Sequence, residues 1–342
     1  MPEGDTLFRA ARTLHRALAG KPVVRFETAL AQLSRVDDDA PIAGRTVERV
    51  HSVGKHLLIA FSGELVLRTH MRMAGSWHVY RPGERWQRPW SAMRVVVETR
   101  DFQAVAFDVP VAEFRTAPEL ARDPAVTSLG PDLLDPGFDA AEALRRLRER
   151  GALGVGDALV DQRALAGIGN VFKSEVCFAE CVHPFTPVAA LDDATLLRLL
   201  QTARRFLGMN VLESSGSGMV TYPGLRGTTR RGDPSARLWV YGGAGEPCRV
   251  CGEPIRLERR GLQARSTYFC PRCQFSEVSA MSVQRGVWHI VGVIRASWPP
   301  RTKWGGAWHD RFECMRRKFH TSPLSAACTG VCSSVRPNGR TR

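Results

Sequence analysis

The sequence predicts an α+β fold, in which one helix precedes an antiparallel β-sandwich and a helical region follows it. Apolar residues recur at helical spacing within residues 6–19, and Gly20 ends the pattern, which predicts an amphipathic N-terminal helix. Alternating, β-branched segments then run from residue 21 to about residue 114, with turns between them. Because no helical pattern interrupts these segments, they favour an antiparallel sandwich or barrel.

The expected strands are short, and turn residues separate them. They cover residues 23–26, 46–50, 56–60, 65–69, 77–80, 93–97 and 105–109. A linker rich in Gly, Pro and Asp follows at residues 130–137. Beyond it the apolar period becomes helical, at residues 140–150, 156–163, 171–181 and 192–207. Residues 214–234 are rich in Gly, Ser and Thr and are expected to form a loop.

The composition is that of a globular protein with about two domains. The chain has 342 residues, of which 44% are apolar and 24% charged, and these values exclude disordered and fibrous classes. No run of about 18 apolar residues occurs, so we expect no membrane partner. The N-terminus is acidic and polar rather than signal-like. These features predict a cytoplasmic protein.

The charge balance favours a polyanionic partner. There are 48 Lys and Arg against 34 Asp and Glu, a net charge of +14, and phosphate contacts release condensed counterions. Residues 281–342 alone hold eleven basic and two acidic residues, or +9, with four tryptophans. This tail lacks steady periodicity and is expected to be disordered. A basic protein without a nucleic-acid role remains the alternative on charge alone.

Four of the nine cysteines form two closely spaced pairs that predict a zinc site. Two residues separate the members of each pair, and eighteen residues lie between the pairs. Paired thiolates on two turns close a tetrahedral site, and a site with four thiolates is structural rather than catalytic. The predicted ligands of this single zinc ion are Cys248, Cys251, Cys270 and Cys273. Cys177 and Cys181 are interpreted as packing residues on a helix face.

The first residues of the chain can carry nucleophilic chemistry. A small residue after Met1 normally permits removal of the methionine, which would leave Pro2 as an N-terminal secondary amine. Such an amine attacks an aldehydic carbon and forms an iminium electron sink. Glu3 beside it can donate or relay protons. Taken alone, however, a start of this kind is usually incidental.

Two glycines precede the helix expected at residues 171–181. Gly167 and Gly169 would expose backbone N–H groups at the positive end of that helix, which is a natural phosphate cradle. Asn170 can cap the helix or bind a phosphate directly. A tight corner between two helices, without a ligand, is the equally weighted alternative.

Together these features resemble the formamidopyrimidine-DNA glycosylase/endonuclease VIII family of base-excision repair enzymes. The resemblance covers about residues 1–274, and its motifs occur in the family's order and spacing. The matching stretches are Pro2-Glu3-Gly4, residues 53–58 (VGKHLL), Asp161-Gln162, residues 165–170 (LAGIGN), residues 238–242 (LWVYG), and residues 265–274 with Arg265, Thr267, Cys270, Pro271, Cys273 and Gln274. The resemblance implies a β-sandwich, a helix–two-turns–helix domain and a zinc β-hairpin that grip damaged double-stranded DNA.

The resemblance also implies a role for each matching residue. Pro2 would attack C1′ of the damaged nucleotide, and Glu3 would be the acid that assists sugar opening. Lys55 would bind the lesion phosphate and help proton transfer. Asn170 and Arg265 would hold the phosphates that flank the lesion, with Arg265 linked to the second elimination.

The turn at residues 70–75 aligns with the loop that fills the gap left by a flipped nucleotide. Met73 would be the apolar wedge, and Arg72 would reach the orphaned base. A methionine buried in the core is the alternative for Met73. The opening residues Asp5 and Thr6 replace the family's commoner Pro-Glu, so a carboxylate usual at position 6 is absent.

This departure resembles the actinobacterial branch of endonuclease VIII. It favours a bifunctional glycosylase and AP lyase for oxidised pyrimidines, with β,δ-elimination at the abasic site. An 8-oxoguanine/formamidopyrimidine-type glycosylase, or a non-catalytic zinc-ribbon DNA-binding protein, is the alternative. The implied parts are a catalytic sandwich (1–125), a helix–two-turns–helix domain (126–240), a zinc finger (241–275) and a basic tail (276–342) of a monomeric, nucleoid-associated protein.

Overall fold

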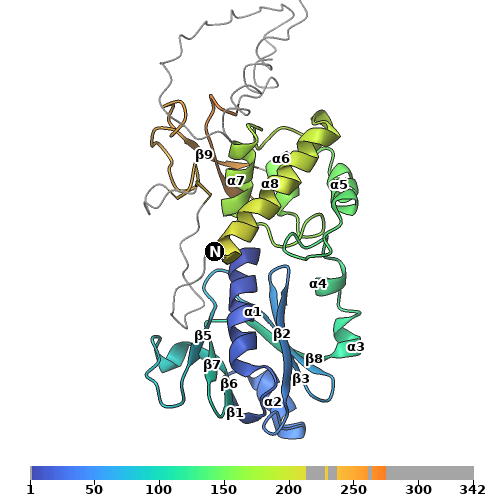
Figure 1. Ribbon diagram of the computed structural model, residues 1–342, viewed down its shortest axis with the longest axis vertical. Coiled ribbons are helices and arrows are strands. Elements are labelled where there is room, and N and C mark those ends of the chain that lie inside the picture. Colours follow the sequence, from blue (N-terminus) through green and yellow to red (C-terminus); the bar gives the residue numbers. More distant parts are fainter. Residues whose placement is uncertain (1, 213–227, 230–236, 261–263, 275–342) are drawn as a thin grey trace, which may run out of the picture. The chain divides into compact units, whose positions relative to one another are not determined.

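The computed structural model describes residues 2–212, 228–229, 237–260 and 264–274. The basic tail and most of the loop expected at 214–234 lie outside these residues. The described part contains the predicted combination of an N-terminal helix, antiparallel sheets, a helical region and a C-terminal hairpin (Figure 1). The predicted α+β class is therefore confirmed.

Two four-stranded antiparallel sheets form the sandwich. One sheet has the order β1-β6-β7-β5 and the other β2-β3-β4-β8. The strands are β1 (Val23–Thr28), β2 (Val47–Val53), β3 (His56–Phe61), β4 (Leu65–His70), β5 (Ser76–Tyr80), β6 (Met93–Thr99), β7 (Gln103–Phe107) and β8 (Val111–Thr116). Helix α1 (Gly4–Leu18) contributes its apolar stripe to the core between them, because Leu7, Leu14 and Leu18 are almost fully buried.

One short helix interrupts the strand region and two more follow it, and the sequence patterns missed all three. Helix α2 (Ala31–Asp39) lies between β1 and β2, and α3 (Ala117–Leu120) and α4 (Pro124–Thr127) follow β8. The expectation of strands without interleaved helices was therefore wrong. Within α2 only Leu33 is buried, so the element is too short and polar to display a helical period. The 3-10 turn η1 (Trp90–Ala92) precedes β6.

The helical region packs around its own core. Its elements are α5 (Ala140–Arg148), α6 (Val155–Val160), α7 (Asn170–Ala179), η2 (Val188–Ala190) and α8 (Asp193–Leu212). Every residue of α7 from Val171 to Ala179 is buried, which is expected of a helix surrounded by other elements. Cys177 lies in this core as predicted, whereas Cys181 lies two residues beyond α7 at φ +55° and is not on the helix face.

The C-terminal hairpin contacts α7. Its strands are β9 (Arg256–Arg260) and β10 (Arg265–Phe269), paired antiparallel. The backbone N–H of Tyr268 donates to the Ser174 hydroxyl at 3.2 Å. Strand β10 is thereby fixed against the side of α7 (Figure 1).

Candidate functional site

Glu3 occupies the N-terminus of α7. Its side chain is fully buried, and its carboxylate accepts hydrogen bonds from the backbone N–H groups of Gly169 at 3.0 Å, Val171 at 2.8 Å and Phe172 at 3.4 Å. The positive end of a helix stabilises a carboxylate placed there. The phosphate cradle predicted from the two glycines is therefore wrong, because a side chain of the protein itself fills it.

Glycines permit this close approach of two distant segments. A Cβ atom on Gly169 would lie 2.5 Å from the Glu3 carboxyl carbon, and one on Gly4 would lie 2.8 Å from Gly167 Cα. The Gly4 N–H donates to the Gly167 carbonyl at 2.7 Å. Gly167 also has φ +98°, a conformation that favours glycine. The N-terminal arm and the turn before α7 thus form one packed unit.

Gln162 fixes the shape of that turn. Its side-chain amide donates to the Ile168 carbonyl at 3.0 Å, and its side-chain oxygen accepts from the Gly167 N–H at 3.1 Å. The sequence motif contained Gln162, but nothing in the residue pattern assigned it this role. Its contribution is to position the turn that receives Glu3.

Lys55 lies in the two-residue turn between β2 and β3. Gly54 adopts φ +58° there, and its N–H donates to the Asp132 carboxylate at 2.7 Å. Burial raises the pKa of Asp132, and hydrogen bonds from Leu134 and Gly54 oppose the shift. Asp132 also forms a backbone bridge with Ala166. The interdomain linker therefore ties the Lys55 turn to the segment before α7.

His70 lies beside Lys55 at the end of β4. Burial lowers the pKa of His70, and the positive charges of Lys55 and Arg72 lower it further. The Arg72 N–H donates to His70 Nδ1 at 3.0 Å, and the His56 ring meets the His70 ring edge-on at 4.9 Å. A neutral imidazole is consistent with these neighbours. His70 therefore connects the Lys55 turn with the turn that holds Arg72, a link that residue type alone did not signal.

The turn that follows β4 presents a methionine to solvent. Met73 is 69% exposed, whereas Met71 is buried. Arg72 has φ +46°, and the Gly75 N–H closes the turn on the Met71 carbonyl at 2.9 Å. The alternative that Met73 is a core residue is therefore excluded. An exposed apolar tip has the geometry of a wedge.

Asn170 and Arg265 lie on neighbouring elements. Gly169 is the N-cap of α7, so Asn170 is the first helical residue and does not cap the helix. Asn170 Oδ1 is buried and has no hydrogen-bond partner among the described residues. Arg265 begins β10, and its charge acts on Lys173 in the second turn of α7. The structure therefore brings Glu3, Asn170 and Arg265 to one end of α7.

A buried carboxylate joins α7 to the segment before the hairpin. Glu175 accepts backbone N–H bonds from Trp239, Val240 and Tyr241 at 2.8–2.9 Å, and a hydroxyl bond from Thr228. Burial raises the pKa of Glu175, and these four donors oppose the shift. The chain that enters the four-cysteine module is thereby anchored on α7.

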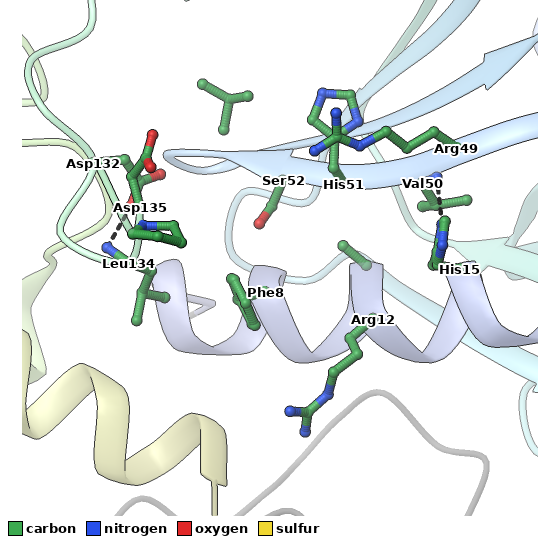
Figure 2. Close-up of a pocket in the computed structure, with 13 residues that line it drawn as sticks. Phe8, Arg12, His15, Arg49, Val50, His51, Ser52, Asp132, Leu134 and Asp135 are labelled. Carbon is green, nitrogen blue, oxygen red and sulfur yellow. Dashed lines mark hydrogen bonds between the residues drawn. The ribbon is translucent and has the colours of Figure 1, made fainter. Parts of the chain in front are cut away.

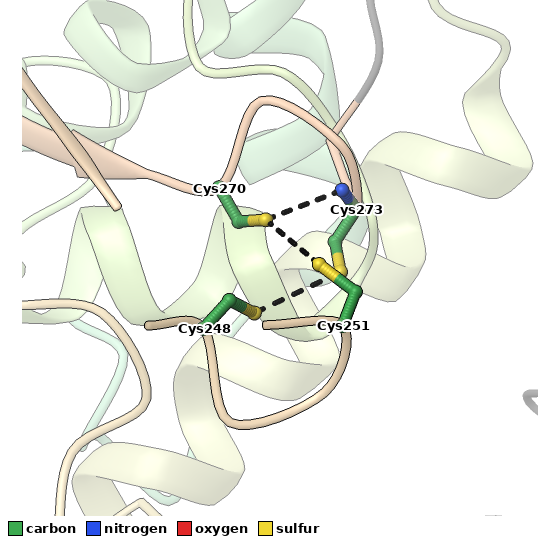
Figure 3. Close-up of side chains that lie close together, drawn as sticks. All are labelled: Cys248, Cys251, Cys270 and Cys273. Carbon is green, nitrogen blue, oxygen red and sulfur yellow. Dashed lines mark hydrogen bonds between the residues drawn. The ribbon is translucent and has the colours of Figure 1, made fainter. Parts of the chain in front are cut away.

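The four predicted zinc ligands converge on one point. The Sγ atoms of Cys248, Cys251, Cys270 and Cys273 all lie within 4.8 Å of one another (Figure 3). Closer pairs are Cys251–Cys270 at 3.4 Å and Cys248–Cys273 at 3.9 Å. Zn–S bonds of about 2.3 Å place tetrahedral sulfurs roughly 3.8 Å apart. The donor set fits one structural zinc ion.

Gln274 secures the zinc module to the helical core. Its side-chain oxygen accepts from the Cys270 N–H, and its amide donates to the Val182 carbonyl, both at 2.9 Å. The side chain is fully buried. The last residue of the recognised motif thus connects a metal knuckle to the segment after α7.

A cavity of about 450 Å³ lies between α1, β2 and the interdomain linker (Figure 2). Phe8, Arg12, His51 and Asp132 are among the residues that line it. It contains none of the side chains predicted for catalysis or DNA binding. Of the described helices, none is both long and apolar enough to cross a membrane.

Comparisons with known proteins agree along the described chain. Residues 1–110 match the formamidopyrimidine-DNA glycosylase N-terminal domain, residues 129–221 the H2TH domain of the same enzyme, and residues 245–274 a zinc finger found in FPG and IleRS. A probable endonuclease 8 2 of Streptomyces coelicolor is 43% identical over 277 residues, which cover 80% of this chain and 94% of the relative.

Further relatives carry related names. A DNA-(apurinic or apyrimidinic site) lyase of Mycolicibacterium smegmatis is 38% identical, and the match covers 80% of this chain and 99% of the relative. A formamidopyrimidine-DNA glycosylase of Heliobacterium modesticaldum is 31% identical, and the match covers 80% of this chain and 100% of the relative. Among solved structures, Lactococcus lactis Fpg in complex with abasic-site DNA superposes with a TM-score of 0.67 at 20% identity, covering 80% of this chain and 100% of that chain. That likeness shows the shared fold.

Proposed function

Because the chain belongs to the formamidopyrimidine-DNA glycosylase/endonuclease VIII family and is a DNA glycosylase and AP lyase of base-excision repair, we propose that Pro2 is its nucleophile. The observation that carries this proposal is the burial of Glu3 in the N-terminus of α7. It anchors the N-terminal arm, and hence the adjacent proline, next to Asn170.

The chemistry begins at the proline nitrogen. Once Met1 is removed, the secondary amine attacks C1′, and the base leaves with the electrons of the glycosidic bond. Attack leaves a proton on the proline nitrogen, and the Glu3 carboxylate relays that proton to O4′ as the C1′–O4′ bond breaks, which leaves a cationic iminium at C1′. That charge acidifies C2′–H, so loss of the proton expels the 3′ phosphate. A second elimination expels the 5′ phosphate.

Cationic and amide side chains around this centre bind the DNA backbone in the proposal. Lys55 holds the lesion phosphate, and Asn170 and Arg265 hold its neighbours. Such contacts fix register without reading sequence. Met73 fills the gap left by the flipped nucleotide, which its exposure permits, and Arg72 faces the orphaned base.

The zinc ion acts structurally. When bound, it holds two turns together and so stabilises the hairpin that carries Arg265. The chain itself holds the hairpin through Glu175 and Ser174 on α7 and through Gln274, which binds Val182 just beyond the end of α7.

Oxidised pyrimidines are the favoured lesions. Relatives named endonuclease 8 and AP lyase are 43% and 38% identical, whereas a formamidopyrimidine-DNA glycosylase is 31% identical. That last similarity supports an 8-oxoguanine/formamidopyrimidine-type specificity as the second candidate.

We further propose that the protein acts as a monomer on damaged duplex DNA in the cytoplasm. In this proposal the sandwich (1–125) is the catalytic domain, residues 126–240 are the DNA-binding domain, residues 241–275 are the zinc finger and residues 276–342 are a basic extension.

Blocking the terminal amine tests the mechanism. Protein whose mass confirms retention of Met1 should bind abasic duplex but neither cleave it nor form a borohydride-stable adduct. Processed protein from the same preparation should do both and serves as the control. Glu3→Gln should lose base removal yet still nick a preformed abasic site. Full activity of the blocked protein would falsify the proline mechanism.

A further inference from the structure

Helix α7 contains a buried lysine that the proposed chemistry does not use. Lys173 is fully buried, and its Nζ has no hydrogen-bond partner among the described residues. A buried ammonium without a partner is costly, because it has lost its water and gained nothing in return. A chain that keeps such a group is expected to pair it at some stage of its working cycle.

The charged neighbours of Lys173 act on it without a hydrogen bond to its Nζ among the described residues. Burial is the main cause that lowers the pKa of Lys173, and the charge of Arg265 on β10 lowers it further. Asp157 on α6, Cys177 on α7 and Glu3 act in the opposite direction. Burial raises the pKa of Cys177 to about 12, so that thiol is neutral. The Glu3 carboxylate already accepts three backbone N–H bonds.

A second unpaired atom lies one turn earlier on the same helix. Asn170 Oδ1 is also buried without a partner among the described residues, and positions three apart share a helix face. The amide of an asparagine can present either its oxygen or its nitrogen by rotation. With the nitrogen presented, Asn170 and Lys173 become two adjacent donors, and Arg265 provides a third from β10. Adjacent donors of this kind suit an anion.

We propose that Lys173 is a further phosphate-binding residue, whose ammonium pairs with a DNA phosphate held between Asn170 and Arg265 when the duplex binds. This inference rests on the proposed function, because it extends the phosphate contacts assigned there. The anion is a backbone phosphodiester, since the family's substrate supplies one beside every nucleotide. Lys173 is a binding residue and takes no part in bond breaking.

Proton uptake follows from this pairing. In the free protein burial and Arg265 favour the neutral amine, whereas a bound phosphate favours the ammonium. Binding should therefore take up protons, and affinity should fall as pH rises above the pKa of the free amine. The titratable or charged groups that face Lys173 are Asp157, Cys177, Glu3 and Arg265.

The test uses full-length protein and a duplex with a non-cleavable tetrahydrofuran abasic analogue. Lys173→Met keeps the side-chain length and removes the amine, and Lys21→Met is the matched control. Lys21 pairs with Asp101 on the sandwich at 2.9 Å. The control variant therefore loses the same charge at a position away from α7. Loss of one phosphate contact should reduce the slope of log affinity against log salt by about 0.9 and weaken binding about eightfold at 0.1 M salt. The control should keep the wild-type slope.

Calorimetry of the wild type in two buffers of different ionisation enthalpy gives a second measurement that needs no variant. Net proton uptake, absent in Lys173→Met, would support the proposal. Equal slopes and affinities for the two methionine variants would overturn it, and so would proton uptake that is the same in Lys173→Met as in the wild type at every pH tested. The analogue cannot react, so failure of the proline mechanism would appear only in borohydride trapping on true abasic DNA.

Discussion

Replacing Gly169 with alanine isolates the contact between the N-terminal arm and α7. The backbone at Gly169 is extended, with φ −138° and ψ −162°, so alanine adopts it without strain. The added methyl, however, would lie 2.5 Å from Glu3 Cδ and 2.7 Å from Glu3 Cγ. Because Glu3 is fully buried, it cannot rotate aside and must leave its position.

The expected loss follows from the hydrogen bonds that Glu3 would give up. The two shorter ones, from Val171 and Gly169, measure 2.8 and 3.0 Å. Bonds to a charged acceptor contribute about 1.5–3 kcal/mol each, so displacement should cost about 3–6 kcal/mol locally. A change from glycine to alanine at an N-cap alone costs about 1 kcal/mol or less.

A double-mutant cycle separates these two contributions. Gly169→Ala should cost about 3 kcal/mol or more in the wild type, but about 1 kcal/mol or less in a Glu3→Ala background, where the collision is gone. Chemical denaturation followed by tryptophan fluorescence measures stability, and hydrogen exchange of the Val171 and Phe172 amides reports on the helix end. Gly208→Ala, on α8 with open space around it, is the control and should be neutral or stabilising.

The same variant should form little borohydride-trapped adduct, because the proline would no longer be held beside Asn170. The reasoning is refuted if Gly169→Ala matches the wild type in stability and trapping. It is also refuted if the cost of the alanine is the same with and without the Glu3 carboxylate.

Three further results are expected. Cys270→Ser should release zinc and abolish DNA binding, which metal analysis and a binding titration would check; tight binding without metal would contradict a structural site. Asn170→Ala and Arg265→Ala should weaken binding to every duplex without changing lesion preference, and Arg265→Ala should flatten the salt dependence. Burial lowers the pKa of both His56 and His78 to about 4. Between about pH 4 and 6.5 the unfolded chain therefore binds more protons than the folded protein, so the free energy of unfolding should fall on acidification through that range. The fall should be less steep in His56→Phe, which chemical denaturation at a series of pH values would check.

The sequence predicted the features whose signal is local and repeated. Strand alternation, helix periods and two cysteine pairs each repeat a chemical pattern at fixed spacing, and the structure confirms the elements and the four-sulfur cluster. The sequence patterns did not predict helix α2, because a nine-residue polar helix with one buried residue shows no apolar period.

Contacts between distant residues could not be predicted from spacing. The two glycines before α7 were interpreted as a site for an external anion, although the carboxylate that fills the site stands 166 positions away at Glu3. In the same way, nothing near Asp132 indicates that its carboxylate binds the Gly54 N–H. The burial of Lys173 could not be predicted either, because a lysine within a helical pattern is normally exposed to solvent.

These long-range contacts bring together proposed catalytic residues that are dispersed along the sequence. Glu3 both accepts hydrogen bonds from the N-terminus of α7 and precedes α1 next to Pro2, the proposed nucleophile, so the N-terminal arm is correctly placed only when the helical region is folded. Asp132 gives the Lys55 turn the same dependence, through the linker and its bridge to Ala166. A sandwich without the helical region would therefore carry Pro2, Glu3 and Lys55 without their common support. In the proposed mechanism the active arrangement therefore belongs to the junction of the two regions, and loosening that junction is expected to lower activity.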